Sequence, residues 1–171
     1  MEISIPPWKI RSWSLADRTS LVKYADNRNI WRNLRDSFPH PYTQPDADQY
    51  LHIVLNQNPE SHFAIASAEE AIGGVGLILQ AGVSAKSAEI GYWLGEPFWG
   101  QGIATVALRA MAEFGFAHFD IVRIYAEVFE WNPASMRVLE KAGFQREGRM
   151  RKSVFKDGQL IDKVIYALIR D

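Results

Sequence analysis

The chain has 171 residues, of which 47% are hydrophobic and 23% charged, a composition typical of globular proteins with their own hydrophobic core. Its 19 Lys and Arg residues against 20 Asp and Glu residues give a formal charge of -1, which argues against nucleic acid as a general partner. Cysteine is absent, so disulfides, thiolate metal sites and a cysteine nucleophile are excluded, and a cytoplasmic location is expected. No linker or repeat interrupts the chain, and we expect a single domain over residues 1–171.

The first third of the chain predicts one strand followed by helices. Apolar and polar residues alternate over Trp8–Trp13, as in a half-buried strand. The first twelve residues, Met1–Ser12, resemble neither a signal peptide nor a membrane span. A helical pattern begins at Asp17, and a shorter one surrounds Trp31. Asp46 is expected to cap a further helix that ends near Pro59.

The middle of the chain predicts a hairpin and then a strand joined to a long helix. The hairpin strands are His62–Ser67 and Ile72–Gln80. The next strand, Ala88–Gly95, leads through a glycine-containing loop into a helix over Ile103–His118.

The last third predicts a strand, a helix and a second hairpin. The strand is Val122–Phe129, and the helix is Asn132–Ala142 with Gly143 as its C-terminal cap. Two strands follow over Phe144–Ile169, with a tight turn at Lys156–Gln159 because Asp-Gly favours the positive φ angles of such turns. We expect an α/β layered sheet, antiparallel at both ends, with a parallel pair where helices intervene.

The glycine-containing loop lies where a strand meets a helix, a place where backbone N–H groups and the positive helix end can hold a pyrophosphate. A plain turn is the alternative, because the segment is not a Walker A loop and lacks the third glycine of a dinucleotide fingerprint. The predicted binding residues are Trp99, Gly100, Gln101, Gly102, Ile103, Ala104 and Thr105.

A second segment, Asn132–Phe144, contains Asn-x-x-Ser and ends in Lys-x-Gly-Phe. Together with the glycine loop it resembles the GNAT family of N-acetyltransferases. The motif Tyr-Trp-x-x-x-x-x-Trp-Gly-x-Gly-Ile-Ala is most similar to the branch with ribosomal-protein N-terminal (alanine or serine) acetyltransferases. The resemblance implies a GNAT-type mixed, mostly antiparallel sheet with splayed middle strands and flanking helices. It also implies acetyl-CoA as co-substrate, with pantetheine along Tyr92, Trp93 and Leu94 and near Asn132 and Ser135.

The resemblance also implies roles in catalysis. Glu89 opens the pantetheine strand and is the first candidate for the general base, directly or through a water, and Glu127 is the second. Each has the alternative of being a solvated strand residue. Many family members carry a tyrosine four positions after the residue matching Ser135; here that position is Leu139, so Ser135 or a water is expected to serve as proton donor. A bulge at Tyr92–Leu94 is expected to free N–H groups for the oxyanion.

The acceptor is expected to be a primary amine, first the α-amine of a protein or peptide. Deprotonating an α-amine at pH 7 costs about 1 to 1.4 kcal/mol, against about 4.6 kcal/mol for a lysine-type amine. A polyamine, amino acid or aminoglycoside is the alternative acceptor, and an acetyl-CoA sensor without catalysis is the alternative function. The four histidines lack metal-ligand spacing, so no metal is expected. No membrane partner is expected, and a homodimer is one assembly considered.

Overall fold

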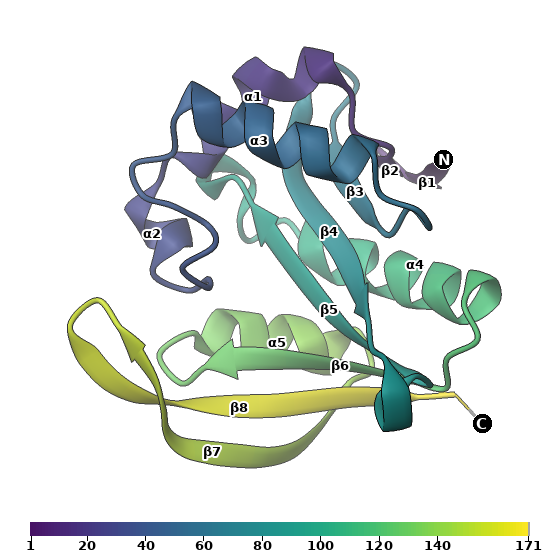
Figure 1. The fold of residues 1–171 in the computed structure, drawn as a ribbon, viewed down its shortest axis with the longest axis vertical. Helices are drawn as coiled ribbons and strands as arrows, with labels where there is room; N and C mark the ends of the chain where they lie inside the picture. Colours follow the sequence, from purple (N-terminus) through teal and green to yellow (C-terminus); the bar gives the residue numbers. More distant parts are fainter. Residues whose placement is uncertain (171) are drawn as a thin grey trace.

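The computed structural model describes residues 1–170, and its strands form one eight-stranded sheet in the order β1-β2-β3-β4-β5-β6-β8-β7 (Figure 1). Neighbouring strands are antiparallel except β5 and β6, which are parallel. The expected mixed, mostly antiparallel sheet with flanking helices is therefore confirmed. The strands are β1 (Glu2–Ile5), β2 (Trp8–Arg11), β3 (His62–Ala66), β4 (Ala71–Leu79), β5 (Ser87–Leu94), β6 (Arg123–Phe129), β7 (Gln145–Lys156) and β8 (Gln159–Ile169).

Helices cover both faces of the sheet, with α1 and α3 on one face and α4 on the other (Figure 1). Successive side chains of a strand point to opposite faces. Accordingly, Ala64 of β3 packs in the cluster with α1 and α3, whereas Phe63 and Ile65 pack in the cluster with α4. The helices are α1 (Arg18–Ala25), α2 (Arg28–Trp31), α3 (Gln44–Leu55), α4 (Ile103–His118) and α5 (Pro133–Lys141), with short 3-10 turns η1 (Leu15–Asp17), η2 (Gly82–Ser84) and η3 (Glu96–Phe98).

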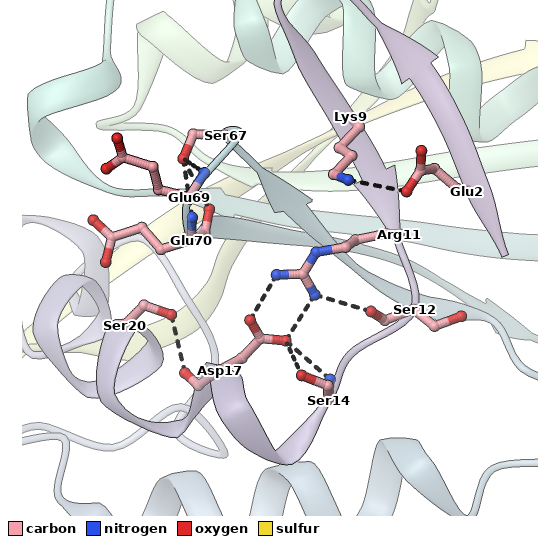
Figure 2. A network of polar contacts seen from close by, with 10 residues as sticks. All are labelled: Glu2, Lys9, Arg11, Ser12, Ser14, Asp17, Ser20, Ser67, Glu69 and Glu70. Atoms are coloured by element: carbon pink, nitrogen blue, oxygen red, sulfur yellow. Dashed lines mark hydrogen bonds and ion pairs between the residues drawn. The ribbon is translucent and has the colours of Figure 1, made fainter.

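The N-terminal elements differ in detail from the sequence prediction. The pattern missed β1, whose four residues are too few for a clear alternation, and the next strand ends at Arg11 rather than Trp13. It ends there because the chain turns into η1, where the Arg11 guanidinium donates hydrogen bonds of 2.8 and 2.6 Å to the two oxygens of buried Asp17 (Figure 2). The backbone N–H of Ser14 donates a third bond to Asp17, at 2.9 Å. This network fixes the start of α1.

The start of α3 also differs from the prediction. Thr43 is its N-cap, and Asp46 lies in the first turn, where its carboxylate accepts a 2.7 Å hydrogen bond from the Thr43 backbone N–H. Asp46 therefore completes a capping box instead of being the cap itself.

The C-terminal hairpin forms as predicted, with φ angles of 50° at Asp157 and 72° at Gly158. Its tip contacts the α2 region: Arg28 pairs with Asp157 at 2.6 Å. The ammonium of Lys156, a residue only 3% exposed, lies 2.9 Å from Asp36 and 4.0 Å from the centre of the Trp31 ring. Two distant parts of the chain are thereby held together at one end of the sheet.

None of the helices in residues 1–170 has both the length and the apolar character needed to cross a membrane.

Candidate active site

The site is built around the point where β5 and β6 separate. Their parallel pairing covers only Ser87–Glu89 of β5 with Arg123–Tyr125 of β6, and the two strands then diverge (Figure 1). The expected splay of the middle strands is therefore present.

The backbone groups of β5 alternate between its two neighbours. The Ser87 carbonyl accepts from Gln80 N–H and the Gly95 N–H donates to Ile72, so the odd-numbered residues face β4 and Tyr92 faces the opening toward β6. The bulge expected at Tyr92–Leu94 is absent, because β4 and β5 pair without a register shift from Gly73↔Leu94 to Leu79↔Ala88. Divergence of β6, rather than a bulge, leaves the Tyr92 N–H facing the opening.

The loop after β5 has the shape required to hold a pyrophosphate. Gly100 and Gly102 have φ angles of 74° and 78°, and a Cβ added to either would meet no atom within 4 Å, so the space above their backbone is open. Gly102 is the N-cap of α4, and the first helical N–H groups, those of Ile103, Ala104 and Thr105, have no partner within the helix by its geometry. Anions are favoured at such a helix end. The backbone here has the features expected of a diphosphate-binding loop.

Two other loop residues use their side chains to shape the loop. The Trp99 indole N–H donates a 2.7 Å hydrogen bond to the Leu94 carbonyl at the end of β5, and the Gln101 amide donates to the Pro97 carbonyl at 3.2 Å. Trp99 thus occupies the backbone carbonyl at the end of β5.

The two candidate bases lie on the face of the sheet that carries α1 and α3, and both are paired with cations. Arg35, from the loop after α2, contacts the carboxylate of Glu89 and that of Glu127, the latter at 3.2 Å. Lys163 of β8 adds a 2.8 Å pair to Glu127. The carboxylates are mostly buried, at 13% and 22% side-chain exposure, whereas the Arg35 side chain is 52% exposed. The two carboxylates and their two cationic partners therefore form a cluster with no net charge.

A cavity of about 230 Å³ opens next to this charge cluster. Cationic and apolar side chains dominate its wall, which is formed by the loop after α2 and by β6, β7 and β8. Burial and the nearby carboxylates of Glu89 and Glu127 raise the pKa of Tyr125, which keeps this neighbouring phenol protonated at neutral pH. The lining residues are Leu34, Arg35, Asp36, Glu127, Phe129, Val154, Phe155, Lys156 and Lys163.

The opposite face of the sheet brings two hydroxyl groups together across the opening. Tyr92 Oη of β5 lies 2.8 Å from Ser135 Oγ in the first turn of α5. The Asn132 side chain caps this helix by accepting a hydrogen bond from the Ser135 backbone N–H at 3.2 Å. Leu139, at the position where the family resemblance implies a tyrosine, is fully buried in the core.

Sequence reasoning placed Glu89, Glu127, Asn132 and Ser135 at the opening but missed three side chains there: Arg35, Lys163 and the hydroxyl of Tyr92. Arg35 lies in a stretch with no regular pattern, and no local signal marked it. Lys163 alternates with buried Asp162 and Val164 on β8, a pattern that marks a strand position without indicating its cross-strand partner. In the part of the chain that the structure describes, no group of three or more His, Asp or Glu residues could hold a metal ion.

The model of the acetyltransferase (GNAT) domain family matches residues 9–145. The chain therefore belongs to the GNAT family, and it is an acyl-CoA-dependent N-acetyltransferase. The resemblance to this family that the sequence indicated is therefore confirmed.

Similar proteins include enzymes with different acceptors. The chain is 39% identical over 117 residues to the probable N-acetyltransferase YjcK of Bacillus subtilis, a match that covers 67% of this chain and 65% of the relative. It is 30% identical to the ribosomal-protein-serine acetyltransferase of Escherichia coli (70% and 66% covered) and 25% identical to the spermidine N(1)-acetyltransferase of Vibrio cholerae (86% and 87%). The fold matches RimL, a ribosomal L7/L12 alpha-N-protein acetyltransferase solved with coenzyme A, with a TM-score of 0.87, 24% identity and 100% and 99% of the two chains covered.

Proposed function

We propose that this N-acetyltransferase acts on the α-amine at the N-terminus of a protein or peptide. The observation that carries this proposal is the charge balance of the acceptor side, where Glu89 and Glu127 face Arg35 and Lys163.

The charge balance disfavours a polyamine acceptor. A polyamine carries two or more cations, and burying each of them requires a carboxylate that is not already paired. Among the described residues of the cavity, Asp36 pairs with Lys156 and Glu127 with Lys163, so a second ammonium would meet cations instead. A single amine needs only one carboxylate, which Glu89 supplies once exposed Arg35 moves aside.

Glu89 is the proposed general base, because Glu127 is engaged by both Arg35 and Lys163 while Glu89 contacts Arg35 alone. An α-amine, with a pKa near 7.7 to 8.0, asks for little help in losing its proton. The N–H of Tyr92, facing the opening, is proposed to stabilise the developing oxyanion. Acetyl-CoA supplies the activated acetyl group, held by the loop residues Gly100–Thr105 and by Asn132 at the start of α5.

The first test is release of CoA from acetyl-CoA, followed with a thiol reagent, which meets no cysteine in this chain. Hexapeptides beginning with Ser or Ala are compared with the same peptides blocked at the α-amine and with spermidine. We expect the free peptides to be used with a kcat/KM at least tenfold above that for spermidine, and the blocked peptides to be inactive. A preference for spermidine would contradict the proposed acceptor while leaving the acetyltransferase assignment intact.

A further inference from the structure

The Tyr92–Ser135 contact joins the two sides of the opening. Tyr92 belongs to β5, three residues beyond the last pairing with β6, whereas Ser135 follows β6 in the first turn of α5. Their hydroxyl oxygens are 2.8 Å apart, and both groups are partly buried. The contact lies on the sheet face that carries α4, away from Glu89 and Arg35 on the other face.

The core contains no alternative hydroxyl at the expected position. Leu139 lies one helical turn after Ser135 and is fully buried and apolar. Without a fixed partner, the hydroxyl hydrogen of Ser135 can rotate toward any nearby acceptor. A fixed donor to Ser135 Oγ would remove this freedom and direct the serine hydrogen elsewhere.

We propose that Tyr92 is a positioning residue whose hydroxyl donates to Ser135 Oγ, so that the Ser135 hydrogen points at the sulfur of the departing coenzyme A thiolate. This inference rests on the transfer reaction assigned above but does not depend on which amine accepts the acetyl group.

The proton and electron balance of the step is simple. The amine nitrogen forms a bond to the acetyl carbon, the carbon–sulfur bond breaks, and its electron pair stays on sulfur. The amine proton goes to Glu89, and the thiolate accepts a hydrogen bond from Ser135. Tyr92 keeps its proton throughout, consistent with the burial that raises its pKa to about 12.

The first measurement needs no acceptor. The thiol of coenzyme A bound to the protein is titrated with pH and followed by the absorbance of its thiolate. Bound dethio-coenzyme A, which lacks the sulfur, gives the baseline, and the chain has no cysteine thiol that would add to the signal. We expect the thiol of coenzyme A to titrate about one pH unit lower when it is bound to the natural protein than when it is free. In Tyr92→Phe and Ser135→Ala, it is expected to titrate close to the free value. A shift that survives in both variants would overturn the proposal.

The second measurement is kinetic and uses whichever tested amine the natural protein acetylates fastest. A hydrogen bond to a charged group contributes roughly a factor of 10 to 100 in rate. We expect Ser135→Ala to lower kcat by that factor, Tyr92→Phe to lower it about tenfold, and the KM for acetyl-CoA to change little. Because the two residues act as one unit, the double variant should be no slower than Ser135→Ala alone.

Matched variants separate positioning from stability. Tyr24→Phe, on α1, removes another partly buried tyrosine hydroxyl, which donates a 2.7 Å hydrogen bond to Glu70, and should leave the thiol titration unchanged. Ser135→Thr keeps a hydroxyl and should retain part of the shift, which provides a test if Tyr92→Phe does not fold. Multiplicative losses in the double variant, or an effect of Tyr92→Phe on KM alone, would show that Tyr92 has only a structural role.

Discussion

At the scale of single residues, the two carboxylates at the opening differ in how strongly they are held. Glu127 has two cationic partners, and Glu89 shares the more exposed of these, Arg35. Position in the strand would make them equivalent candidates, since both lie near the last β5–β6 pairing. Their partners give them different expected roles: Glu89 accepts the proton, and Glu127 anchors Lys163 and Arg35.

We therefore expect Glu89→Gln to lower kcat by about 10² to 10⁴, the usual range for loss of a general base. Glu127→Gln should lower it less than about tenfold. Steady-state kinetics with the preferred peptide, together with calorimetric titration of acetyl-CoA, will check this, since both variants should still bind the co-substrate. A larger loss with Glu127→Gln would reverse the two assignments.

Asp17 gives a prediction for stability against pH. Burial alone would raise its pKa, but hydrogen bonds from Arg11 and Ser14 outweigh burial and hold the pKa below its usual value near 3.9. The stabilisation is therefore complete above about pH 4 and is lost as the pH falls through the lowered folded-state pKa.

Asp17→Asn should cost about 3 kcal/mol at pH 7, because it leaves the largely buried Arg11 guanidinium without a counter-charge. Urea unfolding at pH 7 and pH 3 should show the difference from the natural protein shrinking at the lower pH. Asp48→Asn, which breaks the exposed pair with Arg18, is the control and should change stability by less than about 0.5 kcal/mol. An equal cost at both pH values would contradict the assigned role.

At the scale of elements, the loop before α4 depends on glycine for its backbone conformation. Gly102 has a φ of 78°, in the left-handed region that side chains rarely adopt, whereas Gly148 of β7 has no positive φ. At both positions an added Cβ would meet no atom within 4 Å. The two sites differ in backbone conformation and not in space.

Gly102→Ala should therefore lower stability by about 1 to 2 kcal/mol, whereas Gly148→Ala should be close to neutral. Gly102→Ala should also weaken coenzyme A binding, because relief of the strain turns the backbone amides away from the diphosphate. Thermal unfolding and calorimetric titration of coenzyme A measure the two effects. Equal effects of the two alanines would show that the left-handed conformation is not required.

Lys156 joins the C-terminal hairpin to the α2 region mainly by packing. Its side chain is 3% exposed, but its partner Asp36 is 85% exposed and stays hydrated without it. Lys156→Met preserves the apolar stem over Trp31 and should cost less than about 1.5 kcal/mol, whereas Lys156→Ala should cost about 2 to 4 kcal/mol. Urea unfolding of both variants is the measurement, and equal losses would instead indicate that the charge is decisive.

The elements with strong periodicity were predictable from the sequence. The helix Ile103–His118 has the predicted bounds, and Asp157-Gly158 forms the predicted turn. The four-residue β1 was not predictable, because so short an alternation is common in irregular segments. The bulge at Tyr92–Leu94 was wrong because it was carried over from the family, and the divergence of β6 leaves the Tyr92 N–H facing the opening without one.

The site was predictable only where residues belong to a motif. Glu89, Asn132 and Ser135 were named as site residues because the segments around them resemble motifs of the family. Arg35 reaches Glu89 across 54 residues of sequence and Tyr92 reaches Ser135 across 43, and such contacts depend on the packing of helices on the sheet. No pattern along the chain contains that information.

At the scale of the whole molecule, the sheet consists of two parts, β1–β5 and β6–β8, joined by a short parallel pairing. In the proposed site, on the loop after β5 and the start of α5, coenzyme A would contact both parts. It should therefore oppose their separation as well as stabilise the fold by mass action.

Coenzyme A at 100 times its dissociation constant should raise the free energy of unfolding by about 2.7 kcal/mol. This corresponds to an increase of about 5 to 10 °C in the midpoint of thermal unfolding. Calorimetry measures the midpoint, and hydrogen exchange should show added protection in β6 as well as in β5. Protection confined to the glycine loop would contradict binding across both parts. Adenosine 3′,5′-bisphosphate, which lacks pantetheine, is the control ligand and should protect α4 only.

The ties between α2 and the C-terminal hairpin have a consequence for protein engineering. Most of the cavity wall comes from two segments more than a hundred residues apart, and Arg28–Asp157 and Asp36–Lys156 join them as matched pairs. A graft of either segment from a relative with another acceptor would leave these charges mismatched. Residues 28–36 and 154–163 should therefore be exchanged together, as a single cassette, when the acceptor preference is redesigned.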